Sequence, residues 1–380
     1  MKLVFLTNLV NHHQIPIADE FYRLLGEGYT YVAMEPLPDW LKRTGYSEIE
    51  RPYILRPYED DMVMERVKKM VDSADIVIIG SAPEYLVTNR LKVNKVTFHY
   101  NERWFKEGYR SLLSPRTWWH YWKYHTRYRN KRSYMLCASA FTASDVHKMF
   151  AYPNKCFKWG YFTTVDNKFS VEASKDVSTS ESVHTLMWCA RFLKLKHPEL
   201  PIRMARRLKD MGYCFILDMF GSGEELEKIK SLAKSLCVED VVSFKGNLPN
   251  VDILQEMRKH EIFLFTSDRN EGWGAVTNEA MSCGCAFVGS SAIGAVPFLV
   301  EDGENGLIFE SENLTSLISK VCYLLDNPME CERLAQNAYH SMQEIWSPKN
   351  AVSRFLKLVE YIENDNLENY KQYKGPASWA

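Results

Sequence analysis

The stretch EGWGAVTNEAMSCG, residues 271–284, places two carboxylates eight residues apart in a segment that begins as a glycine-broken loop and continues as a helix. Residues 261–267 before it form an apolar run of β-formers, which predicts a buried strand of a parallel sheet. Residues 285–289 after it predict the next strand. Because ligands of parallel α/β sheets bind at the carboxyl ends of strands, Glu271 and Glu279 are predicted to lie at a binding site.

The chemistry of this segment favours a sugar as the ligand. Gly272 and Gly274 let the backbone approach a ligand closely and can turn N–H groups toward it. A phosphate could use those N–H groups, but two carboxylates would repel it. Carboxylate oxygens accept hydrogen bonds, and the hydroxyl groups of a sugar donate them. The segment therefore predicts a site for a polyhydroxylated ligand.

The rest of the chain alternates strand and helix patterns in two successive blocks, which predicts doubly wound parallel sheets. In a chain of 380 residues, two domains of ordinary size are expected. We expect an α/β fold with two Rossmann-like domains facing across a cleft. The expected parts are an N-terminal domain (1–170), a Ser-rich linker (171–184), a second domain (185–347) and a C-terminal helix (348–380) that packs back toward the first domain. The main expected strands are 3–6, 29–33, 76–79, 95–99, 185–189, 215–220, 241–244, 261–267 and 285–289.

The composition excludes several classes of protein. A hydrophobic content of 46% and a charged content of 25% are typical of a globular protein, and the net charge of -1 argues against a nucleic-acid partner. The nine cysteines are scattered without the spacing of a zinc or redox site. No signal-peptide pattern and no run of roughly 20 apolar residues is found, so we expect a cytoplasmic protein.

Two cations follow the strand predicted at 185–189. Arg191 follows the strand end and Lys196 is expected to enter the next helix, where an arginine fork and a lysine point charge would neutralise a diphosphate. Taken alone, they would more commonly be solvated surface cations. Gly221 follows another strand end within FGSGEE, and a lone Gly-x-Gly is usually only a turn. The strand ends before Arg191, Gly221 and Glu271 are expected to converge on one sheet edge, which strengthens each prediction.

In this setting the second domain resembles the nucleotide-sugar-binding half of the GT-B glycosyltransferases, in particular the large retaining family 4, the group 1 transferases. The resemblance covers roughly residues 185–345 and is strongest in the paired-glutamate segment. The matching pieces, in order, are WCARFLKLK (188–196), FGSGEE (220–225), FKG (244–246), the 271–284 segment and VEDGENGLIF (300–309).

The resemblance implies a role for each matching residue. Glu271 would contact hydroxyls of the donor sugar, Glu279 would hold the ribose, and Arg191 and Lys196 would neutralise the diphosphate. The implied catalytic residues are Glu271, His99, Lys196 and Arg191, and the implied donor-binding residues are Gly221, Phe244, Gly246, Gly272, Trp273, Gly274 and Glu279. Two departures from the family pattern, at 8–14 and 294–298, indicate a divergent subfamily whose phosphate contacts differ there.

The first domain is expected to carry the acceptor and any catalytic histidine. His12 and His13 follow the first strand, and we expect adjacent side chains to point apart, so that only one of them serves the site. His99 ends the strand predicted at 95–99, where some family members place a histidine beside the donor sugar; the alternative is a buried, hydrogen-bonded structural histidine. Glu102 and Arg103, just beyond, are further candidates at the cleft.

Residues 110–132 interleave aromatic rings with cations. Indoles and cations together suit the interface of an anionic bilayer, which predicts peripheral contact with the inner face of the membrane. The alternative is a helix that packs its aromatics inward and shows its cations to water. The residues concerned are Trp118, Trp119, Tyr121, Trp122, Tyr124 and Tyr128, with Arg116, Lys123, Arg127, Arg129, Lys131 and Arg132.

The expected reaction moves a sugar from a nucleotide-diphosphate sugar to a hydroxyl of a saccharide or lipid-linked saccharide, with retention and in cell-surface polysaccharide synthesis. No cofactor and no obligatory metal are expected, because Arg191 and Lys196 supply the positive charge. Two alternatives remain: a nucleotide-sugar epimerase of the same fold, and a non-catalytic nucleotide-sugar-binding protein. An NAD dehydrogenase is disfavoured, since the first strand lacks the Gly-x-Gly-x-x-Gly loop.

Overall fold

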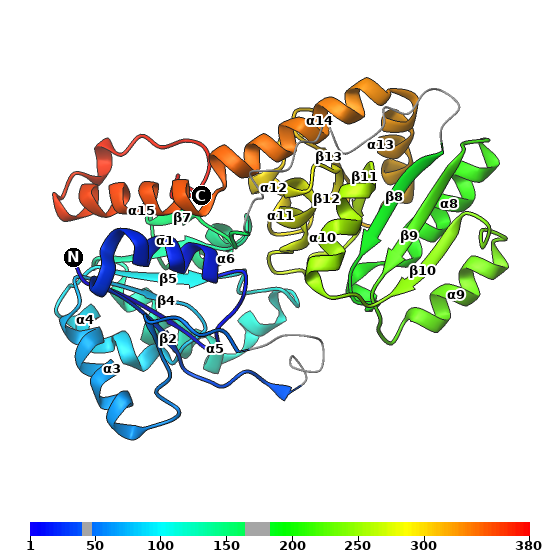
Figure 1. Ribbon diagram of the computed structural model, residues 1–380. Coiled ribbons are helices and arrows are strands. Elements are labelled where there is room, and N and C mark those ends of the chain that lie inside the picture. Colours follow the sequence, from blue (N-terminus) through cyan, green and yellow to red (C-terminus); the bar gives the residue numbers. More distant parts are fainter. Residues whose placement is uncertain (40–47, 164–182) are drawn as a thin grey trace. The chain divides into compact units, whose positions relative to one another are not determined.

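The computed structural model describes residues 1–39, 48–163 and 183–380, which divide into two compact units (Figure 1). Unit 1 comprises residues 1–164 and 348–380, and unit 2 comprises residues 165–347. Of the linker expected at 171–184, residues 171–182 lie outside the described residues, and His184 already begins a strand.

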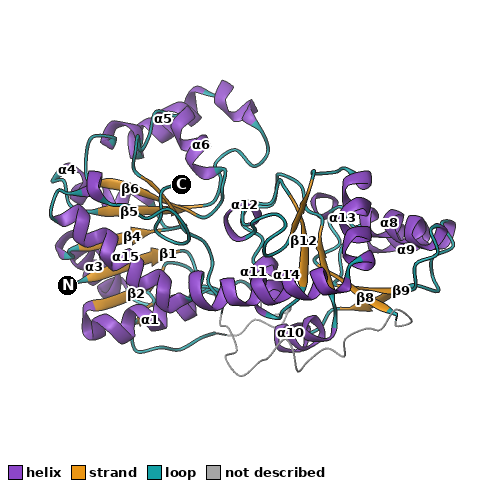
Figure 2. Cartoon of the chain, turned by 90° about the horizontal axis from the view of Figure 1, so that it is seen from above, coloured by secondary structure: helices purple, strands orange, loops and turns teal. Residues whose placement is uncertain are grey.

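Unit 1 is built on a seven-stranded parallel sheet in the order β3-β2-β1-β4-β5-β6-β7, and Figure 2 shows β6, β5, β4, β1 and β2 in this sequence across the unit. The strands are β1 (Leu3–Thr7), β2 (Tyr29–Ala33), β3 (Ile54–Leu55), β4 (Ile76–Ile79), β5 (Thr97–Asn101), β6 (Ser133–Cys137) and β7 (Cys156–Lys158). The chain adds β2 and β3 on one side of β1 and then crosses to β4 on the other side. The topological switch point, where ligands of such sheets bind, therefore lies between β1 and β4.

Helices cover both faces of this sheet (Figure 1). Val67 and Val71 of α3 belong to a buried cluster with Val4 and Val77 of the sheet. On the opposite face, Phe355 of α15 packs 4.9 Å from the Phe98 ring, measured between centroids. The helices are α1 (Ile15–Leu25), α3 (Asp61–Ser73), α4 (Thr88–Lys92), α5 (Pro115–Tyr124), α6 (Thr142–Lys148) and α15 (Pro348–Glu363), with shorter turns η1 (Gly26–Gly28), η2 (Glu84–Val87), η3 (Tyr109–Leu113), η4 (Thr126–Tyr128) and η7 (Leu367–Asn369).

Unit 2 repeats the plan with six parallel strands in the order β10-β9-β8-β11-β12-β13. The strands are β8 (His184–Cys189), β9 (Phe215–Phe220), β10 (Val242–Gly246), β11 (Ile262–Phe265), β12 (Ala286–Ser290) and β13 (Leu307–Phe309). The chain grows from β8 to β10 and then returns to place β11 on the other side of β8. The switch point of this sheet therefore lies between β8 and β11.

The helices of unit 2 also lie on both faces, with α8 and α9 on one and α10 and α11 on the other (Figure 1). Met204 and Leu208 of α8 and Val321 of α13 share one buried cluster with Trp188 and Leu264 of the sheet. The helices are α8 (Glu199–Asp210), α9 (Leu226–Ser235), α10 (Asn250–Lys259), α11 (Val276–Ser282), α12 (Val296–Leu299), α13 (Leu314–Asp326) and α14 (Pro328–His340), with turns η5 (Lys194–Lys196) and η6 (Ser341–Ile345).

One strand begins two residues later than the sequence predicts, and the difference moves a candidate residue. The 95–99 prediction was wrong because residues 95 and 96 close a turn around the buried Arg90 side chain. Lys95 N–H donates to Arg90 O, and the Arg90 guanidinium donates to Val96 O at 2.7 Å. Strand β5 therefore begins at Thr97, and His99 lies in the middle of the strand instead of at its end.

Candidate functional site

The switch point of unit 2 brings together one cation and one carboxylate from adjacent strand ends. Lys196 follows β8 and Glu271 follows β11, and the Lys196 ammonium forms an ion pair with Glu271 Oε2. Both side chains are mostly buried, with 13% and 14% of their surface exposed. The ammonium also lies 5.1 Å from the centre of the Phe265 ring. This pairing holds two charges of opposite sign at the sheet edge where a ligand of this fold binds.

Hydrogen bonds fix the loop after β8 against the end of β11. Thr266 Oγ1 donates to Lys196 O at 2.7 Å and lies 2.9 Å from the donor Nε1 of Trp188. Asp268 N–H donates to Leu195 O at 2.9 Å. Lys196 therefore lies in the 3₁₀ turn η5, which these hydrogen bonds hold in place. The sequence suggested the first turn of a helix instead, but α8 begins only at Glu199.

Arg191 lies on the same loop and differs from Lys196 in its surroundings. It is exposed, and its guanidinium makes no hydrogen bond or ion pair with the residues that the structure describes. A planar guanidinium in this state keeps all its donors for an incoming anion. The edge thus offers one paired cation and one open cation.

Three of the predicted glycines occupy positions with positive φ, and two of these have no space for a side chain. A Cβ at Gly221, with φ +127°, would lie 2.0 Å from the carbonyl oxygen of Ala190. A Cβ at Gly274, with φ +87°, would lie 2.6 Å from the Phe265 ring. Gly246 also has a positive φ, +74°, but no atom lies within 4 Å of its Cβ position. The Gly-x-Gly segment is therefore more than a turn, because it lets two loops at the sheet edge touch backbone to backbone.

Glu279 lies in the first turn of α11 and is buried. Burial raises the pKa of its carboxyl group to about 7, although a hydrogen bond from Asn250 Nδ2 at 2.9 Å opposes the rise. A carboxylate on a helix N-terminus is favoured by the helix dipole, and hydroxyl donors from a ligand would favour it further. The group is thus balanced between its two protonation states near neutral pH.

The remaining predicted donor-site residues pack in or against the interior of unit 2. Trp273 is buried and its Nε1 donates to Asn278 Oδ1 at 2.8 Å, so its indole ring is part of the interior. Gly272, beside it, is also buried. Phe244 is half-buried on the edge strand β10 and packs against the core, with its ring 6.2 Å from Phe192.

The switch point of unit 1 forms a pocket of about 390 Å³ at the carboxyl ends of its strands. Asn8 follows β1, Ser81 follows β4, Asn101 ends β5 and Ala138 follows β6. The Trp104 and Tyr121 rings stack at 4.0 Å in its wall. The lining residues are Thr7, Asn8, Asn11, Gln14, Ser81, Tyr100, Asn101, Glu102, Arg103, Trp104, Lys106, Tyr121, Ala138 and Tyr161.

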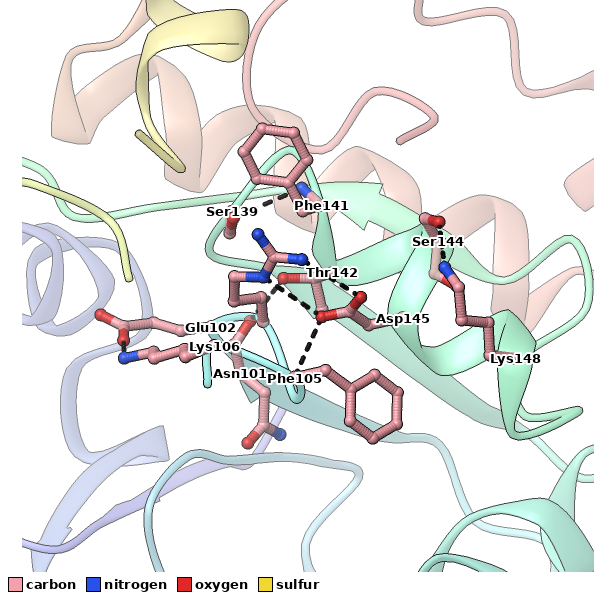
Figure 3. Close-up of polar contacts among 11 residues, drawn as sticks. Asn101, Glu102, Phe105, Lys106, Ser139, Phe141, Thr142, Ser144, Asp145 and Lys148 are labelled. Atoms are coloured by element: carbon pink, nitrogen blue, oxygen red, sulfur yellow. Dashed lines mark hydrogen bonds and ion pairs between the residues drawn. The ribbon is translucent and has the colours of Figure 1, made fainter. Parts of the chain in front are cut away.

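Each charged side chain of this pocket already has a partner of opposite charge. Figure 3 shows Glu102 beside Lys106, with which it forms an ion pair. Arg103 is buried and pairs with Asp145 at 3.4 Å, and Asp145 also accepts the Phe105 N–H at 3.1 Å. Arg103 therefore anchors the loop after β5, and the pocket is polar but nearly neutral.

The three candidate histidines are not among the residues that line this pocket, although His13 N–H donates to Asn11 Oδ1 in its wall at 3.0 Å. His99 is fully enclosed in unit 1, with its ring 4.9 Å from that of His125, and burial holds its pKa well below the ordinary value. It is buried as the structural alternative expected, but its Nε2 atom has no hydrogen-bond partner among the described residues. The expectation that His12 and His13 point apart was wrong: their rings lie 3.7 Å from each other, because the chain there is a loop without strand alternation.

The aromatic and basic segment forms α5 and the turns beside it. Its three tryptophans, Trp118, Trp119 and Trp122, are exposed by 39%, 57% and 52%. Lys123 lies 4.6 Å from the centre of the Trp119 ring, so cations and indoles share one surface. The alternative in which all the aromatics pack inward does not hold for these three. In the part of the chain that the structure describes, no helix is both long enough and apolar enough to cross a bilayer.

Sequence reasoning missed most of the pocket in unit 1. Asn8, Asn11, Asn101, Trp104 and Tyr161 were not singled out for it. A usable signal did exist, because each predicted strand end of a parallel sheet points to the same edge. The polar residues just after β1 and β5 could have been collected on that basis.

In comparison with known proteins, the match to a family model falls on unit 2. Residues 172–341 match the family model described as Glycosyl transferases group 1. N-acetyl-alpha-D-glucosaminyl L-malate synthase of Bacillus anthracis is 27% identical over 203 residues, which cover 53% of this chain and 51% of that protein. Poly(glycerol-phosphate) alpha-glucosyltransferase of Bacillus subtilis is 32% identical over 155 residues, covering 41% of this chain and 22% of that protein. The chain spans about half the length, or less, of these curated relatives.

Solved structures extend the likeness to both units. HepE of Anabaena in complex with UDP matches with a TM-score of 0.68 at 14% identity, over 96% of this chain and 100% of that one. The apo form of the lipopolysaccharide outer core galactosyltransferase WaaB matches with a TM-score of 0.67 at 13% identity, over 95% and 100%. At these identities the likeness establishes the fold, which is GT-B: two Rossmann-like parallel-sheet domains.

Proposed function

Since residues 172–341 match the family model of the group 1 glycosyltransferases and the chain has the GT-B fold, we propose that the protein transfers a sugar from a nucleotide-diphosphate sugar to a hydroxyl group of a saccharide or lipid-linked saccharide. The observation that carries the proposal is the Lys196–Glu271 pair at the switch point between β8 and β11. A transferase of this kind needs positive charge for the diphosphate and a hydrogen-bond acceptor for the sugar, and this edge supplies both.

The reaction divides the work among four side chains. Arg191 and Lys196 stabilise the negative charge that develops on the leaving diphosphate, and no metal ion is needed for that step. Glu271 accepts hydrogen bonds from the sugar, and Glu279 accepts them from the ribose. When the donor binds, the Lys196 ammonium turns from Glu271 toward phosphate, and sugar hydroxyls replace it on the carboxylate.

We propose retention of the anomeric configuration. A double displacement requires a carboxylate nucleophile close to the anomeric carbon. Glu271 is occupied by sugar hydroxyls in this scheme, so the departing diphosphate oxygen takes the proton of the attacking hydroxyl on the same face. Proton NMR of the product gives the anomeric configuration directly, and an inverted product would contradict this route.

The pocket of unit 1 suits an uncharged, polyhydroxylated acceptor. Its cations Arg103 and Lys106 are already neutralised by Asp145 and Glu102, so an anionic acceptor would gain little from them. The stacked Trp104 and Tyr121 rings offer an apolar face of the kind against which a pyranose can pack, and the surrounding asparagines can bind its hydroxyls. A saccharide therefore fits better than a phosphate or a dicarboxylate.

A role in cell-surface polysaccharide synthesis, with peripheral contact to the cytoplasmic face of the membrane, completes the proposal. WaaB is named for the lipopolysaccharide outer core, which supports this setting. The exposed indoles of α5 and their neighbouring cations are suited to an anionic headgroup layer. Co-sedimentation with anionic vesicles should fall when Trp118, Trp119 and Trp122 are replaced by alanine; unchanged co-sedimentation would rule out this contact.

A donor screen tests the central claim. The full-length protein is heated with UDP-, GDP- and ADP-sugars, and the true donor should raise the melting temperature, since it binds the folded state. The same donors are then incubated with and without methyl glycosides, and products are identified by mass spectrometry and NMR. Transfer only with the acceptor supports the proposal. An epimerised nucleotide sugar formed without acceptor would point to an epimerase, and binding without any product would point to a non-catalytic protein.

A further inference from the structure

A second group of chemically active side chains lies in unit 1, and its members are not among the residues that line the pocket. Glu84 from η2 and His120 and His125 from the α5 region converge, with their ligand atoms all within 4.8 Å of one another. His125 Nε2 lies 2.7 Å from Glu84 Oε1, and His120 Nε2 lies 3.2 Å from Glu84 Oε2. Each imidazole therefore faces a different oxygen of one carboxylate.

Hydrogen bonding alone leaves this group incomplete. Glu84 Oε2 is buried and, among the described residues, accepts no hydrogen bond of acceptable geometry, although His120 is close. A buried carboxylate oxygen without a partner is costly, and such an atom commonly marks a missing ion or water. A cation held between this carboxylate and the two imidazoles would supply that partner.

The second ring nitrogen of His125, Nδ1, has the kind of hydrogen-bond partner that a metal-bound histidine usually has. His125 Nδ1 lies 2.5 Å from Tyr152 Oη, and Tyr152 is buried. A neutral imidazole carries one N–H, so donation from Nδ1 to Tyr152 leaves the lone pair on Nε2, directed at Glu84. Ligating histidines usually donate their second nitrogen to such an outer partner, which fixes the tautomer.

We propose that Glu84, His120 and His125 bind a divalent transition-metal ion, for which Zn²⁺ is the best fit. Two imidazoles and one carboxylate form a common three-ligand zinc set, with an open fourth position for water. His120 is half exposed, which leaves that position accessible. Ligand atoms about 2.1 Å from a tetrahedral ion lie roughly 3.4 Å apart, so the 2.7 and 3.2 Å separations need only small side-chain movements.

Such an ion would fix α5 to η2, and through α5 one wall of the pocket. His125 lies 4.7 Å from the Trp104 ring and 5.9 Å from the Tyr121 ring, measured between centroids. Both of these rings line the pocket. The ion would therefore act on the pocket that the proposed function assigns to the acceptor, and its three ligands all come from unit 1.

Zinc binding by the full-length protein, stripped of metal with a chelator, tests the proposal by calorimetry and thermal unfolding. We expect one equivalent of Zn²⁺ to bind and to raise the melting temperature. His125→Ala and Glu84→Gln should each abolish this binding, and Tyr152→Phe should weaken it about 10- to 100-fold as an outer-partner change. His340→Ala, at an exposed histidine at the end of α14, is the matched control and should bind as the parent protein does.

Cobalt distinguishes this site from the cysteines. Co²⁺ bound by two imidazoles and a carboxylate gives visible d–d bands without the near-ultraviolet thiolate charge transfer that a cysteine ligand produces. Bands with thiolate character, or Zn²⁺ binding that survives both His120→Ala and His125→Ala, would overturn the proposal. So would the absence of any shift in melting temperature in the metal-stripped protein, in which case the cluster is an ion-paired clasp only.

Discussion

The two sheets of this protein share one topology but present opposite kinds of edge. At the switch point of unit 2, glycines bring loops together and an ion pair lies beside an open arginine. At the switch point of unit 1, every charged lining residue is neutralised by a neighbour, and stacked aromatic rings form part of the wall. The same architecture therefore provides a charged edge suited to a diphosphate and a neutral edge suited to a saccharide. The difference lies in the loops, since the strands serve both alike.

The largest expected effect is on the charged edge. Glu271→Gln and Lys196→Ala should each reduce kcat/KM by about 10²–10³-fold, because each removes a group that acts on the donor. The double variant should lose less than the product of the two effects, since the side chains contact each other. Steady-state transfer assays measure these losses, with circular dichroism to show that the fold is kept.

Lys194→Ala is the matched control for this experiment. Lys194 belongs to the same 3₁₀ turn as Lys196 but is exposed, and it should leave the rate unchanged. Rates near those of the parent protein for both Glu271→Gln and Lys196→Ala would remove the charged edge from the mechanism.

The next effect concerns how the charged edge is built. Gly221→Ala should lower the free energy of unfolding by about 2–4 kcal/mol, because its Cβ would collide with the Ala190 carbonyl in addition to the backbone strain. Gly246→Ala has the strain without the collision and should cost about 1–2 kcal/mol. Urea unfolding of the two variants separates the cost of backbone strain from the cost of the collision. Equal losses of unfolding free energy would mean that the close approach of Gly221 to Ala190 contributes nothing.

The charged edge was accessible to sequence reasoning because its signals are local. Glu271, Glu279 and the glycines between them lie within nine residues, and Arg191 and Lys196 lie within six of each other. Parallel strands then bring these short segments to one edge without any detailed knowledge of packing. Predicted strands such as 29–33, 76–79 and 215–220 agree with β2, β4 and β9 for the same reason, since a buried strand is a continuous apolar run.

The neutral edge could not be predicted in the same way, because its residues come from the ends of several strands and from α5. The Trp104–Tyr121 stack joins positions 17 residues apart, and the Arg103–Asp145 pair joins positions 42 apart. Placing His99 also required the register of β5, which depends on the buried Arg90. Arg90 is a charged residue of α4 whose guanidinium is buried among backbone carbonyl groups, and no periodic pattern in the sequence reveals such a position.

A smaller, pH-dependent effect should distinguish Glu279 from Glu271. Burial raises the pKa of the Glu279 carboxyl group to about 7 from its ordinary 4.5, so the folded protein holds the proton that the unfolded chain releases. Stability linked to this group is therefore lost as the pH rises from 4.5 through 7. Ribose hydroxyls favour the ionised form, so donor affinity should instead rise with pH, and it should be about tenfold weaker at pH 6 than at pH 8.

Calorimetric titration of the donor across this pH range provides the measurement. Glu279→Gln should flatten the pH dependence and weaken binding at pH 8, whereas Glu227→Gln, on the exposed face of α9, should change neither. A pH profile that persists in Glu279→Gln would assign the titration to another group.

The smallest effect belongs to the neutral edge, and it tests whether the two edges work independently. Trp104→Ala or Tyr121→Ala removes one ring of the stack and should raise the KM for a soluble saccharide acceptor by about two- to tenfold. Trp122 lies on α5 next to Tyr121 but does not line the pocket, so Trp122→Ala should leave that KM unchanged. The dissociation constant of the donor should stay the same in all three variants, because its proposed ligands belong to unit 2. If the donor constant moved with the acceptor KM, the division into a charged donor edge and a neutral acceptor edge would fail, and the aromatic stack would have to act on both substrates.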